Sequence, residues 1–371
     1  MSNLSIFIPV YKESELLEQL LNTLLSDPFE DKEIFVIIDE PTPNSLGLEK
    51  KFSSKVTFIW NGKRKGKANA LNEVIGKSSG EILLFLDSDV MIKNNSNGFL
   101  SRIYAETSKA DIVEVKKFVI RDSILSRIVN YDYLGFNFTS WFLSKKLGKC
   151  LGLNGAAFAI RRETFIKLGG FRKVILEDLD IGIRSFREGL AYKFLDDIEI
   201  YTRAPPSWRQ WFEQRKRWGI GGALWLRENL GYLLKIVKQH PSVVLPPLFF
   251  MFPFLPFFLF ILFTPDELYV KTIYLALIFF STQTSILLPP TAFTASSLAL
   301  LKCFIPLVGS IGVYSSLFGW ITRKMNTAFH PVEFAAFYLI YSPIWLLIIV
   351  VSIVKVYAKI GETRIDWKVD N

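Results

Sequence analysis

Residues 81–89 read Glu-Ile-Leu-Leu-Phe-Leu-Asp-Ser-Asp, an apolar run that ends directly in aspartates. A short apolar run with polar ends predicts a buried β-strand. Leu4–Pro9, Glu33–Ile38 and Val56–Trp60 are runs of the same kind, and Pro9 is expected to stop the first strand. Because helical patterns separate several of these runs, the sequence predicts a parallel, nucleotide-binding α/β sheet.

Acidic residues follow two of the predicted strands. Asp39 comes directly after Glu33–Ile38, and Asp87 and Asp89 close the run at 81–89. Ligands of parallel α/β sheets bind beyond the carboxyl ends of the strands, so these acids fall where a site is expected. Carboxylate oxygens are ligands that Mg²⁺ prefers, and one loop can present both Asp87 and Asp89. An ordinary turn is the alternative, since Asp-Ser-Asp is common turn chemistry.

A second polar cluster lies within the stretch from Val174 to Trp218. Glu177-Asp178 comes near its start, and Gln214-Arg215-Lys216-Arg217-Trp218 closes it. Gln214, Arg217 and Trp218 are spaced i, i+3, i+4, which puts them on one face of a helix. Arginine binds diphosphate bidentately, and tryptophan stacks on sugars. The alternative is a basic-aromatic helix at a membrane interface, which explains Arg215 and Lys216.

These motifs together resemble the membrane-bound family 2 glycosyltransferases, which include cellulose, chitin and hyaluronan synthases and the ceramide glucosyltransferases. The resemblance covers Leu4 to Gly222 by motif and the rest of the chain by layout. It is carried by Asp39, Gly66-Lys67-Ala68-Asn69-Ala70-Leu71-Asn72, Asp87-Ser88-Asp89, Leu176-Glu177-Asp178 and Gln214 to Trp218. The chain departs from the family pattern at Lys12, where Asn is frequent, at Glu40, where Asp is frequent, and at Leu176, where Thr is commoner.

The resemblance implies an α/β, GT-A-like, Rossmann-related nucleotide-diphosphosugar transferase domain, followed by an α-helical transmembrane domain. On the donor side it implies that Asp39 binds the nucleotide base, flanked by Pro9 and Tyr11. Lys67 is then expected near the donor phosphates and sugar. A Mg²⁺ or Mn²⁺ ion is expected on Asp89, aided by Asp87.

On the acceptor side the resemblance implies that Asp178 is the general base of an inverting transfer, supported by Glu177. Asp180 is a rival for this role, and acids in the first turn of a helix are often only partners of the helix dipole. Diphosphate and acceptor contacts are implied for Gln214, Arg217 and Trp218.

The C-terminal third of the chain has the composition of a membrane domain. Its apolar segments, each near the length needed to cross a bilayer, are 243–263, 270–288, 298–321 and 331–355. An aromatic-rich segment at 121–143 is predicted as an interfacial helix, with a buried core helix as an equal alternative. The predicted organisation is a cytoplasmic glycosyltransferase domain over 1–222, an amphipathic interfacial helix over 223–240, a transmembrane domain of about four helices over 241–357, and a cytoplasmic tail over 358–371.

Composition limits the kinds of binding partner that are expected. The net charge is +9, but the basic residues form no regularly spaced stripe, so anionic lipid and a nucleotide diphosphate are expected rather than nucleic acid. Only two cysteines, Cys150 and Cys303, and two histidines are present, which argues against a zinc site. No apolar run of the signal-peptide type opens the chain, so the catalytic half is expected in the cytoplasm of a multi-pass cell-membrane protein.

The sequence therefore predicts an inverting, metal-dependent glycosyltransferase. It is expected to move a sugar from a nucleotide-diphosphate sugar, a UDP-sugar in particular, to a hydroxyl of a lipid, lipid-linked or glycan acceptor. Two alternatives remain. One is a processive polysaccharide synthase that extrudes its polymer, and the other is a non-catalytic nucleotide-binding membrane scaffold.

Overall fold

The structure, a computed structural model, describes residues 3–93, 98–288 and 294–359. The chain divides into two compact units. Unit 1 comprises Met1–Leu248 and Leu347–Asn371, and unit 2 comprises Phe249–Leu346. The chain therefore leaves unit 1 after Leu248 and returns to it at Leu347.

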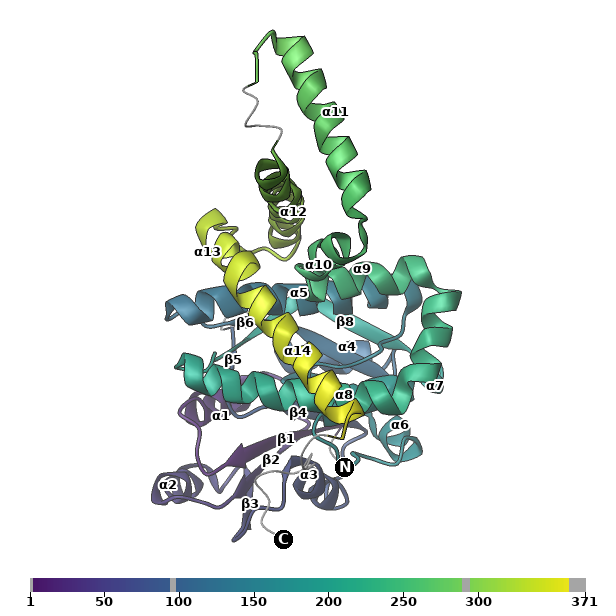
Figure 1. Ribbon diagram of the computed structural model, residues 1–371. Coiled ribbons are helices and arrows are strands. Elements are labelled where there is room, and N and C mark those ends of the chain that lie inside the picture. Colours follow the sequence, from purple (N-terminus) through teal and green to yellow (C-terminus); the bar gives the residue numbers. More distant parts are fainter. Residues whose placement is uncertain (1–2, 94–97, 289–293, 360–371) are drawn as a thin grey trace. The chain divides into compact units, whose positions relative to one another are not determined.

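Within the described residues, unit 1 is built on an eight-stranded sheet in the order β3-β2-β1-β4-β7-β6-β8-β5 (Figure 1). The first four strands in that order are parallel, as predicted, but β7 is antiparallel to both β4 and β6, so the sheet is mixed. The strands are β1 (Leu4–Tyr11), β2 (Lys32–Asp39), β3 (Thr57–Asn61), β4 (Ile82–Leu86), β5 (Val90–Ile92), β6 (Ile112–Val119), β7 (Ala157–Arg161) and β8 (Tyr192–Thr202).

Helices cover both faces of the sheet and bury it in two apolar clusters. One cluster takes side chains from α1, α2 and α4, and the other from α3, α6 and α7. Leu17, Leu20, Leu21 and Leu24 of α1 are all buried. These helices are α1 (Leu17–Ser26), α2 (Pro43–Phe52), α3 (Lys67–Ile75), α4 (Phe99–Thr107), α6 (Arg162–Lys167) and α7 (Glu177–Arg187).

Pro9 does not stop the first strand, contrary to the prediction. β1 continues through Pro9 to Tyr11. Strand β4 pairs with β1 only from Leu4 to Phe7, whereas β2 pairs along its whole length. Pro9 therefore lies beyond the end of one ladder, where a missing N–H is tolerated.

Helix α5 (Ile124–Leu147) occupies the segment predicted as interfacial. Ser123 caps its N-terminus, and Gly148, in the left-handed region at φ 60°, follows its C-terminus. More than half of its residues are buried, and it packs on β6 and β8. The packing agrees with the alternative prediction for this segment, that of a buried core helix. Contact of its remaining face with a membrane stays a prediction.

Helix α8 (Trp208–Gln239) is continuous across the predicted boundary between residues 222 and 223. The Gln214–Trp218 motif and the segment predicted as amphipathic beyond residue 222 therefore belong to one helix. In this segment, Leu230 and Leu234 are exposed, the latter by 60%. An interfacial helix is expected to show such leucines, and its contact with a membrane stays a prediction.

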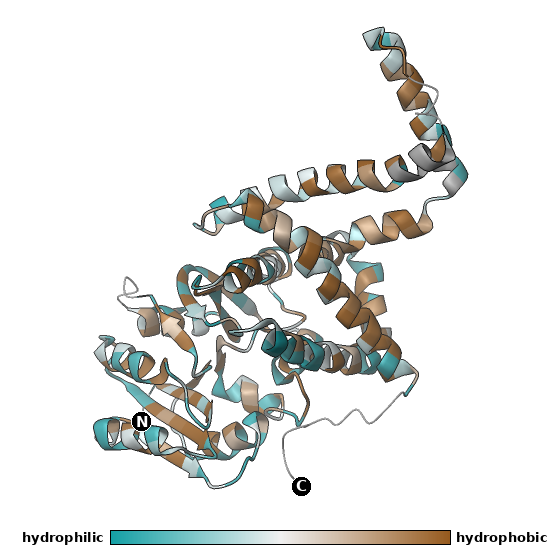
Figure 2. Cartoon of the chain, turned by 60° about the vertical axis from the view of Figure 1, so that its left-hand side comes forward, coloured by the Kyte–Doolittle hydropathy of each residue, from teal (hydrophilic) through white to brown (hydrophobic). Residues whose placement is uncertain are grey.

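The segments predicted to span a membrane form helices rich in hydrophobic residues (Figure 2). Of the described residues, two helices are long and apolar enough to cross a bilayer, Leu301–Lys324 and Pro331–Tyr357. The predicted span at 243–263 is instead two helices that meet at 105°, a broken span or a re-entrant loop. The predicted count of about four spans stays a prediction. The helices here are α9 (Pro241–Met251), α10 (Leu255–Phe263), α11 (Asp266–Thr284), α12 (Ala295–Lys324), α13 (Pro331–Ala336), the π-helical turn η2 (Phe337–Tyr341) and α14 (Ser342–Tyr357); most of the predicted tail lies outside the described residues.

Candidate active site

Asp39, at the carboxyl end of β2, is a buried acid that organises the loop before α3. Its Oδ1 accepts a hydrogen bond from Asn61 Nδ2 at 2.8 Å. Its Oδ2 accepts the backbone N–H groups of Lys65 and Gly66, both at 3.0 Å. Gly66 has φ 80°, a conformation that favours glycine, and directly precedes α3. Asp39 therefore fixes the loop that brings Lys67 to the site.

Lys67, the first residue of α3, joins the two acidic motifs. Its Nζ lies 2.8 Å from Asp87 Oδ1 and 3.2 Å from Glu177 Oε1. Burial by itself lowers the pKa of Lys67, but the attraction of Asp87 and then Glu177 outweighs burial and raises the pKa above its usual value. The loop after β4 and the start of α7, 90 residues apart in sequence, thus meet at one ammonium group.

Asp89 lies beside Asp87 and accepts a hydrogen bond from Thr202 Oγ1 at 3.3 Å. Burial and then repulsion by Asp87 raise the pKa of Asp89 to about 6. Two carboxylates in one loop are hard oxygen donors, the set suited to Mg²⁺ or Mn²⁺. Among the described residues no three acids, histidines or cysteines gather as a complete metal site. A pair fits an ion that takes its remaining ligands from substrate phosphates and water.

Asp178, on the first turn of α7, is held by backbone donors. Its Oδ2 accepts the N–H of Gly155 and its Oδ1 the N–H of Leu179, both at 2.8 Å. A Cβ on Gly155 would lie 2.9 Å from Oδ2, so this close approach requires glycine. Burial and then repulsion by Glu177 raise the pKa of Asp178, and Lys67 opposes them.

Asp180, the rival acid, lies in a different environment. Its carboxylate is buried and pairs with Arg184 at 2.6 Å and Arg172 at 3.1 Å. Neither arginine belongs to the cluster of Lys67, Asp87 and Glu177. Asp180 is therefore occupied as the anion of an ion-pair network.

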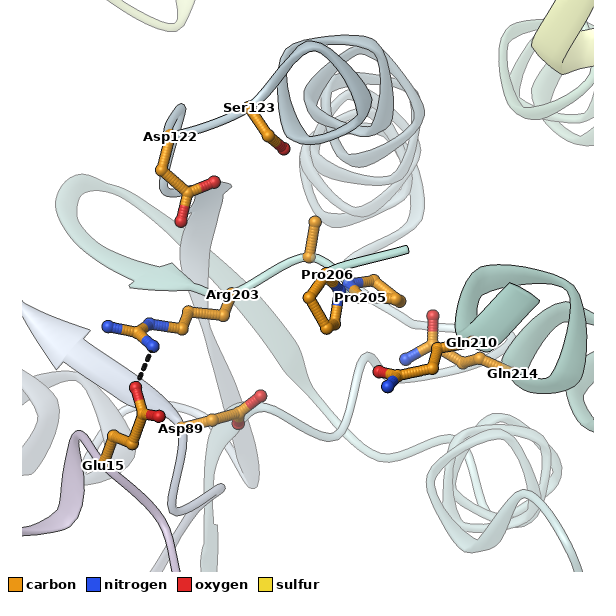
Figure 3. A pocket seen from close by; sticks show the side chains of 10 residues that line it. Glu15, Asp89, Asp122, Ser123, Arg203, Pro205, Pro206, Gln210 and Gln214 are labelled. Atoms are coloured by element: carbon orange, nitrogen blue, oxygen red, sulfur yellow. Dashed lines mark hydrogen bonds and ion pairs between the residues drawn. The ribbon is translucent and has the colours of Figure 1, made fainter. Parts of the chain in front are cut away.

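A pocket of about 560 Å³ opens beside the acidic loop (Figure 3). Asp89 lies on one side of it, and Gln210 and Gln214 reach into it from α8. An ion pair between Glu15 and Arg203 forms part of its wall. The remaining lining residues are Asp122, Ser123, Ala204, Pro205 and Pro206. The metal-binding candidate and the first residue of the Gln214–Trp218 motif thus face one space.

Arg215 of that motif does not lie at a surface, as the interfacial alternative implied. Arg215, which an interfacial helix explained well, is fully buried and pairs with Asp132 of α5 at 2.8 Å. The Trp218 ring lies 4.4 Å from its guanidinium carbon, so this part of the interfacial interpretation is wrong. Arg217 is exposed and Trp218 is half-buried.

Three residues near the site were not predicted to have a role there. Asp132 was visible as a charge in an apolar segment, but nothing in the sequence identified Arg215 as its partner. Thr202 ends a strand with no motif around it. Lys117 of β6 is a buried lysine whose neighbours are known only once the strands are paired.

The fold and these acids at the sheet edge define a glycosyltransferase of the GT-A-like class, and the comparisons agree. Residues 5–169 match the model of the family described as Glycosyl transferase family 2. The chain is 24% identical over 375 residues to a Bacillus subtilis (strain 168) protein named "Probable glycosyltransferase YdaM", covering 98% of this chain and 85% of that one. It is 23% identical over 249 residues to the poly-beta-1,6-N-acetyl-D-glucosamine synthase of Staphylococcus aureus (strain COL), covering 66% of this chain and 60% of that one.

A solved structure has a similar fold. It is the mannosyltransferase PcManGT from Pyrobaculum calidifontis in complex with GDP-Man and Mn²⁺. The TM-score is 0.50 with 19% identity, over 62% of this chain and 64% of that one. The chain thus carries a family 2 glycosyltransferase domain and is a glycosyltransferase.

Proposed function

We propose that this glycosyltransferase moves a sugar from a nucleoside diphosphate sugar to a hydroxyl group of a lipid or lipid-linked acceptor at a membrane. The observation that carries the proposal is the position of Lys67, which binds Asp87 of the loop after β4 and Glu177 of α7 at the same time. A donor held at the first acid is then within reach of a base beside the second.

The donor class is supported by the relatives. The mannosyltransferase of similar fold was solved with GDP-Man and Mn²⁺, and the staphylococcal relative is named as a synthase of an N-acetylglucosamine polymer. On this chain, Asp39, Pro9 and Tyr11 would contact the base, and Lys67 the phosphates. Asp89 and Asp87 would hold the divalent ion, which neutralises the diphosphate that leaves.

Asp178 is proposed as the general base. An inverting transfer forms the bond from the acceptor oxygen to the anomeric carbon while the bond to the diphosphate breaks, and the hydroxyl proton passes to the base. Asp178 keeps its carboxylate beside Glu177 and Lys67, whereas Asp180 is occupied by Arg172 and Arg184. Arg217 and Trp218 are proposed to contact the diphosphate and acceptor, with Gln214 on the pocket side.

A membrane acceptor is supported by the apolar helices and by α8. Two helices of the described residues are able to cross a bilayer, and α8 carries the exposed Leu230 and Leu234 beyond the motif residues. An acceptor whose sugar or hydroxyl lies at the bilayer surface would reach the motif residues along this helix. The proposed location is a membrane, with the glycosyltransferase domain over residues 1–222 in the cytoplasm.

A processive polysaccharide synthase is the second candidate. It is favoured by the staphylococcal relative, whose printed name describes a polymer synthase and which aligns over two-thirds of this chain. Both candidates use the same donor chemistry, so they differ in the product rather than in the site.

The experiment that tests the proposal uses membranes that contain the full-length protein. They are incubated with a panel of radiolabelled UDP- and GDP-sugars, and the label is measured in organic extract and in high polymer. Label in the lipid extract that disappears in Asp178→Asn is the expected result. Label in polymer alone favours the second candidate, and absence of label from every donor, with folded protein, contradicts the proposed function.

A further inference from the structure

Lys117 is a buried lysine next to the candidate active site that no motif includes. It lies in β6, and its side chain is only 1% exposed. Its backbone is fixed to α5 through Asn137, which accepts from the Lys117 N–H at 3.2 Å and donates to its C=O at 2.7 Å. Helix α5 therefore fixes the backbone of β6 at Lys117.

An irregularity in the strand turns Lys117 toward α5. Alternate residues of a regular strand face opposite sides, so residues three apart do not share a face. Glu114 contacts Ser140 of α5, and Lys117 lies over the Tyr133 ring of α5 at 5.9 Å. The register between β6 and β8 shifts between Val115 and Lys116, in the interval that separates these two residues. Such irregularities often redirect a side chain beside an active site.

The ammonium group of Lys117 has no hydrogen-bond partner within the part of the chain that the structure describes. Its neighbour Lys116, which is 3% exposed, has two: Glu199 at 3.2 Å and the carbonyl of Asp196 at 2.7 Å. A buried charge without hydrogen bonds costs several kcal/mol. Burial lowers the pKa of Lys117 to about 8, although nearby carboxylates oppose the shift.

The protein acids around Lys117 do not accept a hydrogen bond from it. Glu114 instead accepts from Tyr192 at 2.8 Å and from Ser140 at 3.2 Å. The other charges that act on the ammonium group are Asp178, Asp87 and Lys67, in that order. These are the candidate base and the residues of the donor side. The ammonium group of Lys117, whose donors are unused, thus lies within electrostatic range of both the base and the donor side.

Resting on the proposed function, we infer that Lys117 binds the sugar unit that is transferred, by donating hydrogen bonds to its oxygen atoms. The diphosphate has Lys67 and the metal-binding acids as its own partners. The sugar must lie between those groups and Asp178, and these are the charges that act on the unpartnered ammonium group of Lys117. A sugar hydroxyl or carbonyl oxygen supplies them.

The test compares the affinity for a nucleotide with and without its sugar. Full-length protein in lipid nanodiscs with Mn²⁺ is titrated calorimetrically with UDP, UDP-N-acetylglucosamine, GDP and GDP-mannose. For the pair that binds, Lys117→Met is expected to raise the ratio of the sugar-nucleotide Kd to the nucleotide Kd about tenfold or more. Lys116→Met, a change of equal size on the other face of β6, is expected to leave this ratio unchanged.

A structural role predicts a different result. If Lys117→Met weakens both ligands equally or neither, the inference fails while the proposed function stands. If wild-type protein binds none of the four ligands, the proposed function fails and this inference with it. The Tm of the nucleotide-free protein gives a second measure. Lys117→Met is expected to keep or raise it, because an unpaired buried charge is removed, whereas a fall larger than that of Lys116→Met would assign a structural role.

Discussion

At the scale of single residues, Asp178 and Asp180 of α7 have different environments, one suited to a general base and the other to a structural ion pair. Burial and then repulsion by Glu177 raise the pKa of Asp178, although the backbone N–H groups of Gly155 and Leu179, which it accepts, oppose the rise. Asp180, two residues on, is neutralised by Arg172 and Arg184. A general base needs a carboxylate that is free to accept a proton, and the carboxylate of Asp180 is instead held in its ion pairs with both arginines.

Asp178→Asn is expected to slow sugar transfer by on the order of 10²–10⁴-fold and to leave nucleotide affinity near that of the wild type. Asp180→Asn is expected instead to reduce stability by about 1–3 kcal/mol, because charged hydrogen bonds are weakened. Turnover, nucleotide affinity and unfolding are measured for both. The reverse pattern, with Asp180→Asn inactive but stable, would move the base two residues along the chain.

The carboxyl group of Asp178 also predicts how the turnover of the wild-type protein depends on pH. The base works deprotonated, and the pKa of Asp178 is raised, so turnover is expected to rise with pH through a value above the ordinary carboxyl range. Turnover is lost as pH falls through that value. The residual activity of Asp178→Asn should lack this acid limb, and an identical limb in the variant assigns it to another group.

Sugar transfer is expected to depend on a divalent metal ion held by Asp89 and Asp87. Asp89→Ala is expected to reduce both donor affinity and turnover, the latter on the order of 10²-fold or more, because the ion that neutralises the diphosphate is lost. EDTA should abolish wild-type activity, and added Mn²⁺ or Mg²⁺ should restore it. Full activity in EDTA would exclude this role for the pair.

Some of these residues could be found from sequence and others could not. Asp39 and Asp87 were visible because each follows an apolar run that pairs in the sheet, and strand ends of a parallel sheet meet at one edge. The contact of Lys67 with Glu177 was not predicted, because the resemblance implied only that Lys67 lies near the donor phosphates and that Glu177 supports Asp178. Lys117 could not be found, because its orientation depends on a register shift between strands that are far apart in sequence.

At the scale of elements, α5 and α8 are joined by a buried ion pair. Asp132 and Arg215 are 2% and 0% exposed, and Trp211 and Trp218 lie on the arginine. Removing one member of such a pair leaves an uncompensated charge, which costs about 3–5 kcal/mol. The pair thereby fixes the helix that carries Gln214 and Trp218 onto the sheet.

Arg215→Met is therefore expected to lower the free energy of unfolding by about 3–5 kcal/mol. The double variant Arg215→Met/Asp132→Asn should be less destabilised than the sum of the two single variants, because the orphaned carboxylate is gone. Chemical unfolding of all four proteins in detergent gives the coupling. Strict additivity would mean that the two charges do not stabilise each other.

The second half of α8 tests the placement at a membrane. Leu234 is 60% exposed on an apolar stripe, while Lys235 follows it on a different face. With Cys303 replaced by serine, a bimane label on Leu234→Cys is expected to be quenched by bilayer lipids brominated in their acyl chains. The same label on Lys235→Cys should be quenched far less. Equal quenching at both sites contradicts an interfacial helix.

Sequence predicted these elements unevenly. Hydropathy identified 298–321 and 331–355 because a bilayer requires long uninterrupted apolar helices, and both helices are present. It overlooked the break within 243–263, where Pro253 and Pro256 interrupt an apolar run that hydropathy treats as continuous. It also divided α8 at residue 222, because a change of composition does not end a helix.

At the scale of the whole molecule, unit 1 is completed by the end of the chain. The last helical turns of α14 pack on α8, where Arg227 Nη1 donates to the carbonyl of Val356 at 3.2 Å. Gly219, directly after the motif residue Trp218, also lies close to this helix. A Cβ there would lie 2.6 Å from Ser352 Oγ and 3.3 Å from Ile348 Cγ2. An apolar helix about 130 residues downstream therefore limits where the motif helix can lie.

Gly219→Ala is expected to destabilise the protein by about 1–3 kcal/mol and to reduce turnover, because the added methyl group pushes α14 away from α8. Gly222 is the matched control. It lies on the same helix, and a Cβ added there would meet no atom within 4 Å, so Gly222→Ala should be neutral or stabilise by up to about 1 kcal/mol through helix propensity. Unfolding and sugar transfer are measured for both variants in nanodiscs. If Gly219→Ala stabilises the protein as much as Gly222→Ala and keeps full turnover, the close packing of the C-terminal helix does not position the motif helix.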